Sequence, residues 1–183
     1  NVVGEAELKT YQYNDIQRVL KQVPGVYLRD EDGFGLRPNI GMRGASPDRS
    51  ATLTLMEDGI LLGPAPYAAP AAYYFPLTAR LAGVEVYKGP ASIQFGPNTV
   101  GGAINLLSRG IPEGRQGAVD IAMGQYGSNK AHVWMGESGD TWGVVLEGMH
   151  LGSSGFKTLP NGADTGFNRN DIMAKVRLNS PSG

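Results

Sequence analysis

The clearest pattern of apolar and polar positions lies in the C-terminal part of the chain, from about residue 115 onward. Four segments there alternate residue by residue, with apolar side chains at every second position. In the last segment, Ile172 and Val176 share one set of positions, while Asp171 and Lys175 occupy the other. Because successive side chains of a strand point to opposite faces, this period predicts strands with one apolar and one polar face. The four segments are Ala118–Tyr126, Lys130–Met135, Trp142–Glu147 and Asn170–Leu178.

Strands of this design suit a soluble β-sandwich or a membrane-spanning β-barrel, and the alternation alone does not choose between them. A tilted strand needs roughly 9–11 residues to cross the hydrocarbon layer. The links between the segments are short at "YGSN" and "SGDT", long at "SSGFKTLPNGADTGFN", and short again at "SPSG". Outer-membrane barrels keep their periplasmic turns tight and allow long loops outside, so the barrel interpretation predicts an extracellular loop at residues 155–167.

The N-terminal part, residues 1 to about 110, mixes a predicted helix with short predicted strands. The helix lies in "YNDIQRVLKQVPG", where Asn14 is the expected N-cap and Pro24-Gly25 the expected stop. One side of this helix is apolar at helical spacing, which predicts that it packs on a small sheet. The apolar residues are Ile16, Val19, Leu20 and Val23. The segment "NVVGEAEL" is strand-like, and the other candidate strands are "GVYLRD", "NIGMRG", "ATLTLMEDGI", "VEVYKG" and "GAINLLSR".

The two patterns meet near "SRGIPEGRQ", which marks the expected domain boundary. We expect an α+β domain with a small mixed sheet and short helices over residues 1–110, and about four antiparallel strands over residues 111–183. The stretch before the boundary, "KGPASIQFGPNTVGGAINLLSR", is crowded with glycine and proline. A phosphate-binding loop needs Lys-Ser or Lys-Thr at a helix start, whereas "VGGAINLL" predicts a strand. Gly96, Gly101 and Gly102 are therefore expected to serve tight bends and close backbone packing.

Composition removes several classes of function. The formal net charge of -1 gives no electrostatic reason to expect nucleic acid as a partner. With Cys 0 and His 2, the sequence predicts neither disulfides nor a thiolate or histidine-rich metal centre. The acidic stretch "RDEDGFG" lacks the spacing and the closing glutamate of a calcium loop, so we expect no metal there and no cofactor. No nucleophile–base or paired-carboxylate arrangement stands out, so we expect no enzyme activity and no catalytic residue.

Four motifs, in order and at consistent spacing, resemble the plug domain of TonB-dependent outer-membrane receptors. They are "DIQRVLKQVPGVYLR", "RPNIGMRG", "LTLMEDGILL" and, as the most specific, "VEVYKGPASIQFGPNTVGGAINLLSR". Together they extend over nearly all of residues 1–110. The resemblance implies that the first region is an α+β plug. It also implies that the second region supplies the first antiparallel strands of a transmembrane β-barrel, which has about 22 strands in this family.

The resemblance also implies a function, the energy-coupled uptake of a ferric chelate, either a siderophore or ferric citrate, across the bacterial outer membrane by a monomeric barrel. The segments "APYAAP" and "FGPNTVGGAIN" are most similar to the ferric-dicitrate-type receptors. The implied partners are the chelate, outer-membrane lipid, and TonB, which binds a short N-terminal box that we expect to be absent from this sequence. The alternative is a soluble α+β module that binds a ligand or partner without transport.

Five residues take site roles from this resemblance. Arg43, in "MRG", corresponds to a plug arginine that pairs with barrel glutamates in the family, and Lys88 stands where the family has a second arginine. Lysine keeps the charge but loses the bidentate geometry, so the second of these latches is expected to be weaker. For the chelate, Arg49 is expected to supply charge, and Tyr67 and Asn98 to supply directed hydrogen bonds. The residues expected to face the barrel lumen are Asp120, Lys130, His132, Glu147, Lys175 and Arg177.

Overall fold

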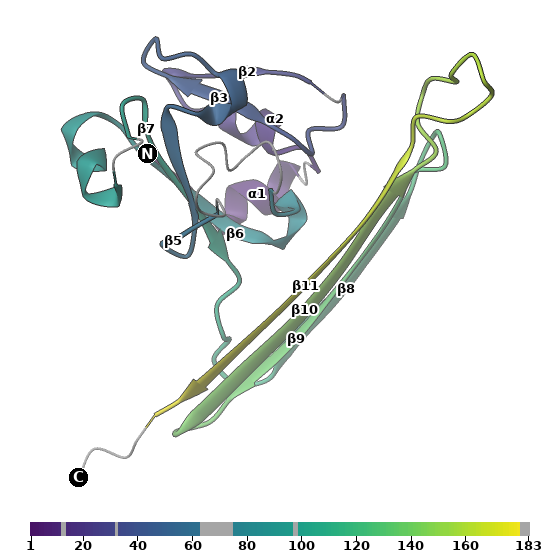
Figure 1. Cartoon of the computed structure of the whole chain (residues 1–183). Helices are drawn as coiled ribbons and strands as arrows, with labels where there is room; N and C mark the ends of the chain where they lie inside the picture. Colours follow the sequence, from purple (N-terminus) through teal and green to yellow (C-terminus); the bar gives the residue numbers. More distant parts are fainter. Residues whose placement is uncertain (12–13, 32, 63–74, 97–98, 180–183) are drawn as a thin grey trace. The chain divides into compact units, whose positions relative to one another are not determined.

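The computed structural model describes residues 1–11, 14–31, 33–62, 75–96 and 99–179. The chain divides into two compact units, Asn1–Ser108 and Arg109–Gly183. The first unit mixes helices with strands, whereas the second is made of four long strands (Figure 1). All the helices found in the described residues lie in the first unit.

The first unit is built on a mixed five-stranded sheet in the order β1-β6-β7-β4-β5. Strands β4 and β7 run parallel, and the other neighbours run antiparallel. Strands β2 and β3 form a separate antiparallel pair. The bounds are β1 Val2–Val3, β2 Val26–Arg29, β3 Asn39–Met42, β4 Leu53–Glu57, β5 Ile60–Leu61, β6 Leu81–Tyr87 and β7 Gly102–Ser108. The five candidate strands from "GVYLRD" to "GAINLLSR" are therefore confirmed.

The helices differ from the sequence prediction at three points. Helix α2 ends at Leu20 with Lys21 as its C-cap, so the predicted stop at Pro24-Gly25 lies beyond the helix and is wrong. Asp15, rather than Asn14, is the N-cap of α2, because its Oδ1 accepts a hydrogen bond from the backbone N–H of Gln17 at 2.8 Å. The strand-like interpretation of "NVVGEAEL" is right only for β1 and wrong from Glu5 onward, where Glu5 and Lys9 form an i,i+4 ion pair at 2.8 Å along a helix. The α-helices are α1 Glu5–Tyr11 and α2 Ile16–Leu20, and 3₁₀ helices occupy Asp48–Ser50, Thr78–Arg80 and Gly89–Phe95.

The hydrophobic core of the first unit joins α2 to both of its sheets. The predicted apolar face is confirmed, because its four residues are at most 3% exposed, with Ile16, Val19 and Leu20 on α2 and Val23 in the turn that follows it. They pack in one cluster with residues of β3, β4, β6 and β7, among them Ile40, Leu55, Val84 and Ile104. Full burial of such a side chain stabilises the fold by about 1.5–3 kcal/mol, so this cluster holds the layers of the unit together.

Glycine serves close packing and turns at the positions where the sequence predicted them. A Cβ at Gly102 would lie 2.5 Å from the carbonyl O of Tyr87, and one at Gly101 would lie 2.8 Å from Leu53 Cδ2. Gly96 has open space around it but a φ of 114°, so it serves the bend rather than the packing. At the turn after β4, Asp58 and Gly59 both have positive φ, as the tight turn between β4 and β5 requires.

The second unit is a four-stranded antiparallel sheet in the order β11-β10-β9-β8. The pairing of β10 with β11 runs from Trp142 opposite Leu178 to Ser153 opposite Phe167 without a shift of register. The strands are β8 Gln116–Met123, β9 Asn129–Ser138, β10 Trp142–Ser153 and β11 Phe167–Leu178. All four predicted strands are confirmed. Strands β9, β10 and β11 are longer than the segments that the alternation marked, whereas β8 both begins and ends earlier than predicted.

The two faces of this sheet carry different side chains, as predicted. Leu146 lies opposite Met135 on β9 and Ala174 on β11, whereas Glu147, the next residue, points to the other face. We call the first of these the apolar face, and its large residues are exposed, with Ile172 at 85%. They are Val119, Ile121, Met123, Val133, Met135, Leu146, Ile172 and Val176. The opposite, polar face carries Asp120, Lys130, His132, Glu147, Lys175 and Arg177.

Candidate functional site

The two residues predicted as latches meet at one turn of the first unit, Pro24-Gly25. The backbone N–H of Arg43 donates to the carbonyl O of Gly25 at 3.2 Å, and the ammonium group of Lys88 donates to the carbonyl O of Pro24. The guanidinium of Arg43 also packs on Gly89, where an added Cβ would lie 3.0 Å from Arg43 Nη1. The structure therefore brings Arg43 and Lys88 together, although they lie far apart in the sequence.

Arg43 stands at the edge of an open hollow. Its φ of 53° lies in the left-handed region that non-glycine residues rarely adopt and that is enriched at functional sites. The hollow has a volume of about 520 Å³, and its described lining contains no acidic residue. It includes Ile93 and Val100, which are 77% and 82% exposed. A cation beside exposed apolar side chains is suited to contact another surface, and any carboxylate for Arg43 must come from outside this lining.

Of the three predicted chelate-binding residues, the structure describes one. Arg49 lies in the 3₁₀ segment Asp48–Ser50 with a φ of 49°, and its side chain is exposed. Its backbone N–H donates to Asn39 Oδ1 at 2.9 Å, which ties this loop to β3. Tyr67 and Asn98 lie outside the described residues. The role of the three residues in ligand capture thus stays a prediction.

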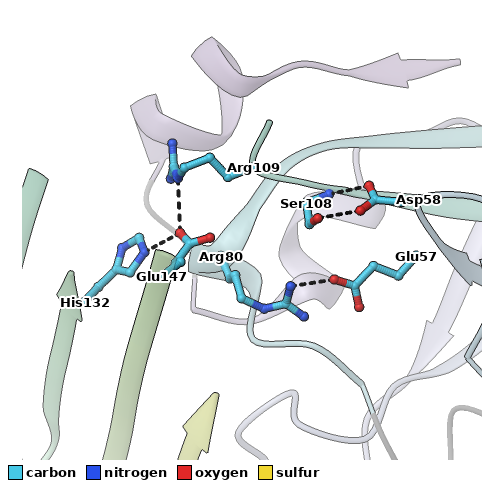
Figure 2. Close-up of polar contacts among 7 residues, drawn as sticks. All are labelled: Glu57, Asp58, Arg80, Ser108, Arg109, His132 and Glu147. Atoms are coloured by element: carbon cyan, nitrogen blue, oxygen red, sulfur yellow. Dashed lines mark hydrogen bonds and ion pairs between the residues drawn. The ribbon is translucent and has the colours of Figure 1, made fainter. Parts of the chain in front are cut away.

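Two acidic residues at the end of β4 hold neighbouring elements of the first unit (Figure 2). Glu57 Oε1 lies 2.5 Å from Arg80 Nη1, and the side chain of Arg80 is only 3% exposed. The carboxylate of Asp58 accepts from the backbone N–H of Ser108 at 3.0 Å and from its hydroxyl at 2.5 Å. Asp58 therefore fastens the last residue of β7. The "DG" signal predicted the turn, but no signal in the sequence showed what this carboxylate would bind.

Another polar chain crosses the same sheet. Glu85 Oε2 accepts hydrogen bonds from Tyr87 Oη at 2.8 Å and from Asn105 Nδ2 at 2.9 Å. The hydrogen bond to the Glu85 carboxylate raises the pKa of the Tyr87 hydroxyl, because only the protonated hydroxyl can donate it. Asn105 Oδ1 in turn accepts from the backbone N–H of Gly59 at 2.8 Å. These bonds are structural, since none of them presents an activated nucleophile.

A second cluster, on the polar face of the second unit, gathers around Glu147 (Figure 2). Its Oε1 accepts from Arg109 Nε at 3.2 Å and lies 2.7 Å from His132 Nε2. The guanidinium of Arg109 also lies over the Trp134 ring, 4.2 Å from its centroid. Sequence alternation placed His132 and Glu147 on the predicted lumen face but did not pair them. The pair depends on the register between β9 and β10, which no local pattern specifies.

Among the residues that the structure describes, no group of three or more His, Asp or Glu side chains could hold a metal ion. No helix in the described part of the chain is both long and apolar enough to cross a membrane. The described residues offer fixed charges, an exposed loop at Arg49 and close backbone packing.

Comparison with known proteins identifies a family for this chain. The family described as TonB-dependent Receptor Plug Domain matches residues 1–103. The vitamin B12 transporter BtuB of Photobacterium profundum is 27% identical over 184 residues, which cover 96% of this chain and 29% of that protein. The BtuB of Vibrio vulnificus is 25% identical, over 97% of this chain and 29% of its own length. The chain thus spans under a third of the length of these relatives.

Solved structures show the same fold. The ferric yersiniabactin uptake receptor FyuA from Yersinia pestis matches with a TM-score of 0.77 and 19% identity, over 98% of this chain and 28% of that one. The siderophore receptor PirA from Acinetobacter baumannii matches with a TM-score of 0.71 and 20% identity, over 98% and 29%. These matches extend over both units, so the predicted fold class, a plug followed by antiparallel strands, is confirmed.

The relatives are transporters and receptors, not enzymes, as the sequence predicted. The similarity to ferric-dicitrate-type receptors stays a prediction, because the relatives named above belong to other types. With a family match over residues 1–103 and a mixed sheet, short helices and closing "AINLLSR" strand in the predicted order, the chain belongs to the plug domain family of TonB-dependent receptors.

Proposed function

We propose that this chain is the plug and the first four barrel strands of a receptor for energy-coupled uptake of a ferric chelate across the bacterial outer membrane. The observation that carries the proposal is the apolar face of the second unit. Large apolar side chains on all four strands of this face are exposed, among them Ile121, Val133, Leu146 and Ile172. A contiguous apolar surface of this kind is costly in water and stable against hydrocarbon.

The height of the apolar face supports a membrane setting. On β10 it runs from Trp142 to Gly148 and stops at His150, whose ring nitrogens lie 2.8 Å from Asn129 Oδ1 and from Asn170 Oδ1. Trp142 and His150 are separated by about 27 Å at ~3.4 Å per residue. With a strand tilt of about 40°, this gives a height of roughly 20 Å, close to the apolar band of about 25 Å on outer-membrane barrels. An aromatic residue at one edge, Trp142, also matches such a band.

Membrane fractionation of the full-length protein that contains this chain tests the setting. We expect the protein in the outer-membrane fraction, resistant to alkaline carbonate and released by detergent. Recovery in a soluble fraction without detergent would favour the alternative, a soluble α+β module that binds a ligand without transport. TonB is the proposed energy-coupling partner, so uptake should require TonB and the proton-motive force.

The nature of the chelate is tested by measuring the uptake of alternative ligands. Two curated relatives are vitamin B12 transporters, whereas the solved structures with the same fold include siderophore receptors. Cells that lack their own receptors and produce the full-length protein would be given radiolabelled ferric citrate, a ferric siderophore or cobalamin. We expect uptake of iron. Uptake of cobalamin alone would disprove the ferric chelate and leave the receptor function intact.

Arg49, Tyr67 and Asn98 are the proposed plug residues for chelate capture. Support comes from the exposed side chain of Arg49, because a ferric chelate of the citrate type is anionic. The double substitution of Arg49 and Asn98 by alanine should weaken chelate binding at least tenfold without lowering outer-membrane insertion. Arg18→Ala, at an exposed arginine of α2, is the matched control. Unchanged affinity in the double variant would remove this site.

Arg43 and Lys88 are the proposed latches between plug and barrel. The hollow beside Arg43 offers no acid in its described lining, which is consistent with a glutamate supplied from elsewhere in the receptor. The side chain of Arg43 is exposed in this structure, and removing one partner of an ion pair that the complete barrel would bury costs about 3–5 kcal/mol. Arg43→Gln keeps most of the aliphatic part of the side chain and the same backbone demand at positive φ, and it removes the guanidinium group with its charge.

We expect Arg43→Gln to accelerate hydrogen exchange in β3 and to let small solutes leak through the barrel. Lys88→Arg, made in the wild-type receptor, should slow hydrogen exchange in β3 and reduce solute leakage, because arginine restores a bidentate donor. This requires that the arginine give up the contact with Pro24 that lysine makes. Wild-type exchange and permeability in Arg43→Gln would show that Arg43 is a solvated charge rather than a latch.

A further inference from the structure

The segment that links the last plug strand to β8, residues 109–115, makes specific contacts with the sheet of the second unit. We call it the connector. Ser138, the last residue of β9, uses its hydroxyl twice: it donates to the carbonyl O of Pro112 at 2.7 Å and accepts from the backbone N–H of Gly114 at 3.3 Å. These bonds satisfy backbone groups that a mobile link would leave to water.

Two glycines make room for the connector on the polar face of the sheet. A Cβ at Gly136 on β9 would lie 2.6 Å from Pro112 Cδ, and a Cβ at Gly143 on β10 would lie 2.8 Å from Ile111 Cγ2. Neither glycine has a positive φ, so glycine is needed here for space rather than for backbone conformation. A gap on each of two neighbouring strands, each filled by a connector side chain, is a fitted contact.

Arg109, the first residue of the connector, is held by side chains of β9 and β10. Its Nε donates to Glu147 Oε1, and its guanidinium covers the ring of Trp134, the residue directly opposite Glu147 across β9 and β10. His132 Nε2 binds the same carboxylate oxygen at 2.7 Å, which orients Glu147 towards Arg109 (Figure 2). Glu147 is 2% exposed, and its Oε2 has no hydrogen-bond partner among the described residues. Arg109 and His132, both at Oε1, are therefore the partners that the described residues show for this buried carboxylate.

From these contacts we propose that β9 and β10 form a built seat for the connector, and that Glu147 is the positioning residue of this seat. The connector is then an anchor and not a flexible tether. Its consequence rests on the proposed transport function: when the plug rearranges to let a chelate pass, the chain stays attached at Arg109. Movement is confined to elements before β7, whose last residue, Ser108, is fastened within the first unit by Asp58.

A pair of glycine variants in the full-length protein tests the seat. Gly143→Val removes the space for Ile111, and valine is favoured in strands, so β10 itself should persist. Gly148→Val is the matched control on the same strand and the opposite face, where an added Cβ would meet only Val133 Cγ1 at 3.9 Å. We expect hydrogen exchange of residues 110–115 to rise at least tenfold in Gly143→Val and to stay at the wild-type rate in Gly148→Val. Equal rates in the two variants would overturn the proposal.

A second pair tests the positioning role of Glu147. Glu147→Gln keeps the shape and removes the charge that holds Arg109. Asp120→Asn is the control, because it removes a carboxylate of the same face that binds Lys130 at 2.5 Å rather than the connector. We expect trypsin to cleave after Arg109 at least tenfold faster in Glu147→Gln than in Asp120→Asn. Equal cleavage would show that Glu147 does not position the connector.

The failure of this inference is distinguishable from a failure of the proposed function. Exchange and cleavage at the connector report the seat directly, whether or not the protein transports a chelate. Outer-membrane insertion and iron uptake of the same variants report the function. A receptor that takes up iron with a freely exchanging wild-type connector would overturn the seat alone, whereas a protected connector in a protein without uptake would overturn only the transport proposal.

Discussion

The two units use strands of similar composition in opposite ways. Ile104 on β7 is completely buried, whereas Ile121 on β8 is 67% exposed. In the first unit, helix α2 and the smaller sheet join the core cluster with the main sheet, so apolar residues are buried within the unit itself. In the second unit, the apolar face is formed by one sheet and stays exposed. The comparison teaches that alternation specifies a strand, while the surroundings decide whether its apolar side chains stabilise the fold in water.

The largest effect is expected from truncation in the plug core. Ile104→Ala removes most of a fully buried side chain and leaves a cavity, which costs about 3 kcal/mol within a usual range of about 2–5 kcal/mol. Ile121→Ala, on the apolar face of β8, should cost less than about 1 kcal/mol, because little packing is lost there. Denaturant unfolding of the full-length protein compares the two, and equal losses would contradict the contrast between the units.

A charge on the apolar face should come next. Leu146→Arg places a guanidinium in the middle of that face, which costs about 2–4 kcal/mol if the face contacts hydrocarbon. Met173→Arg is the control, because Met173 lies opposite Glu147 on the polar face, where a cation is tolerated. Insertion and unfolding measured in lipid vesicles should separate these variants. If Leu146→Arg were as stable as Met173→Arg, the apolar face would be in contact with water, which would favour the soluble alternative.

A smaller effect is expected at the end of the plug sheet. Asp58→Asn suits the positive φ at this turn but removes the charge from both hydrogen bonds to Ser108. Hydrogen bonds to charged groups contribute about 1.5–3 kcal/mol to stability. The asparagine amide oxygen remains as a neutral acceptor, so we expect the free energy of unfolding to fall by about 1–2 kcal/mol. The amide of Ser108 should exchange faster, while the β8 amides of the second unit should not change. A uniform change across both units would argue against a local fastening.

The smallest effect concerns the N-cap of α2 and depends on pH. Burial raises the pKa of the Asp15 carboxyl. The hydrogen bond from the Gln17 backbone N–H lowers this pKa, but its effect is smaller than that of burial. The folded state therefore holds this proton more tightly than the unfolded chain, whose pKa is 3.8. Stability contributed by the protonated carboxyl is present below that value and is lost as pH rises through the raised folded pKa.

Asp15→Asn tests this directly, because asparagine caps helices as well as aspartate but does not titrate. We expect the variant to lack this fall in stability between acidic and neutral pH, while Asp15→Ala should be about 1 kcal/mol less stable than Asp15→Asn at every pH. Urea unfolding of the full-length protein at several pH values provides the measurement. Parallel stability profiles for wild type and Asp15→Asn would show that the Asp15 carboxyl does not titrate differently on folding.

The site was less predictable than the fold. Individual residues such as Arg43 and Lys88 were marked by motifs, but their shared contact with the Pro24-Gly25 turn depends on chain segments that fold together from distant positions. The Glu147 cluster had no sequence signal beyond alternation, because the spacing of Arg109, His132 and Glu147 in the chain has no meaning until two strands pair in register.

What the sequence by itself determined is local. The period of two specified β8 to β11, apolar spacing specified the buried side of α2, and "DG" specified the turn between β4 and β5. The sequence did not predict the N-cap at Asp15 or the helix that begins at Glu5. Neighbouring residues there have similar propensities, so small differences in hydrogen bonding decide which residue caps the helix and where it begins. Only the tertiary structure decided that β4 and β7 run parallel, that Asp58 holds Ser108, and that Gly136 and Gly143 leave room for the connector. These contacts join residues far apart in the chain, so their energies depend on packing geometry that no short window of sequence contains.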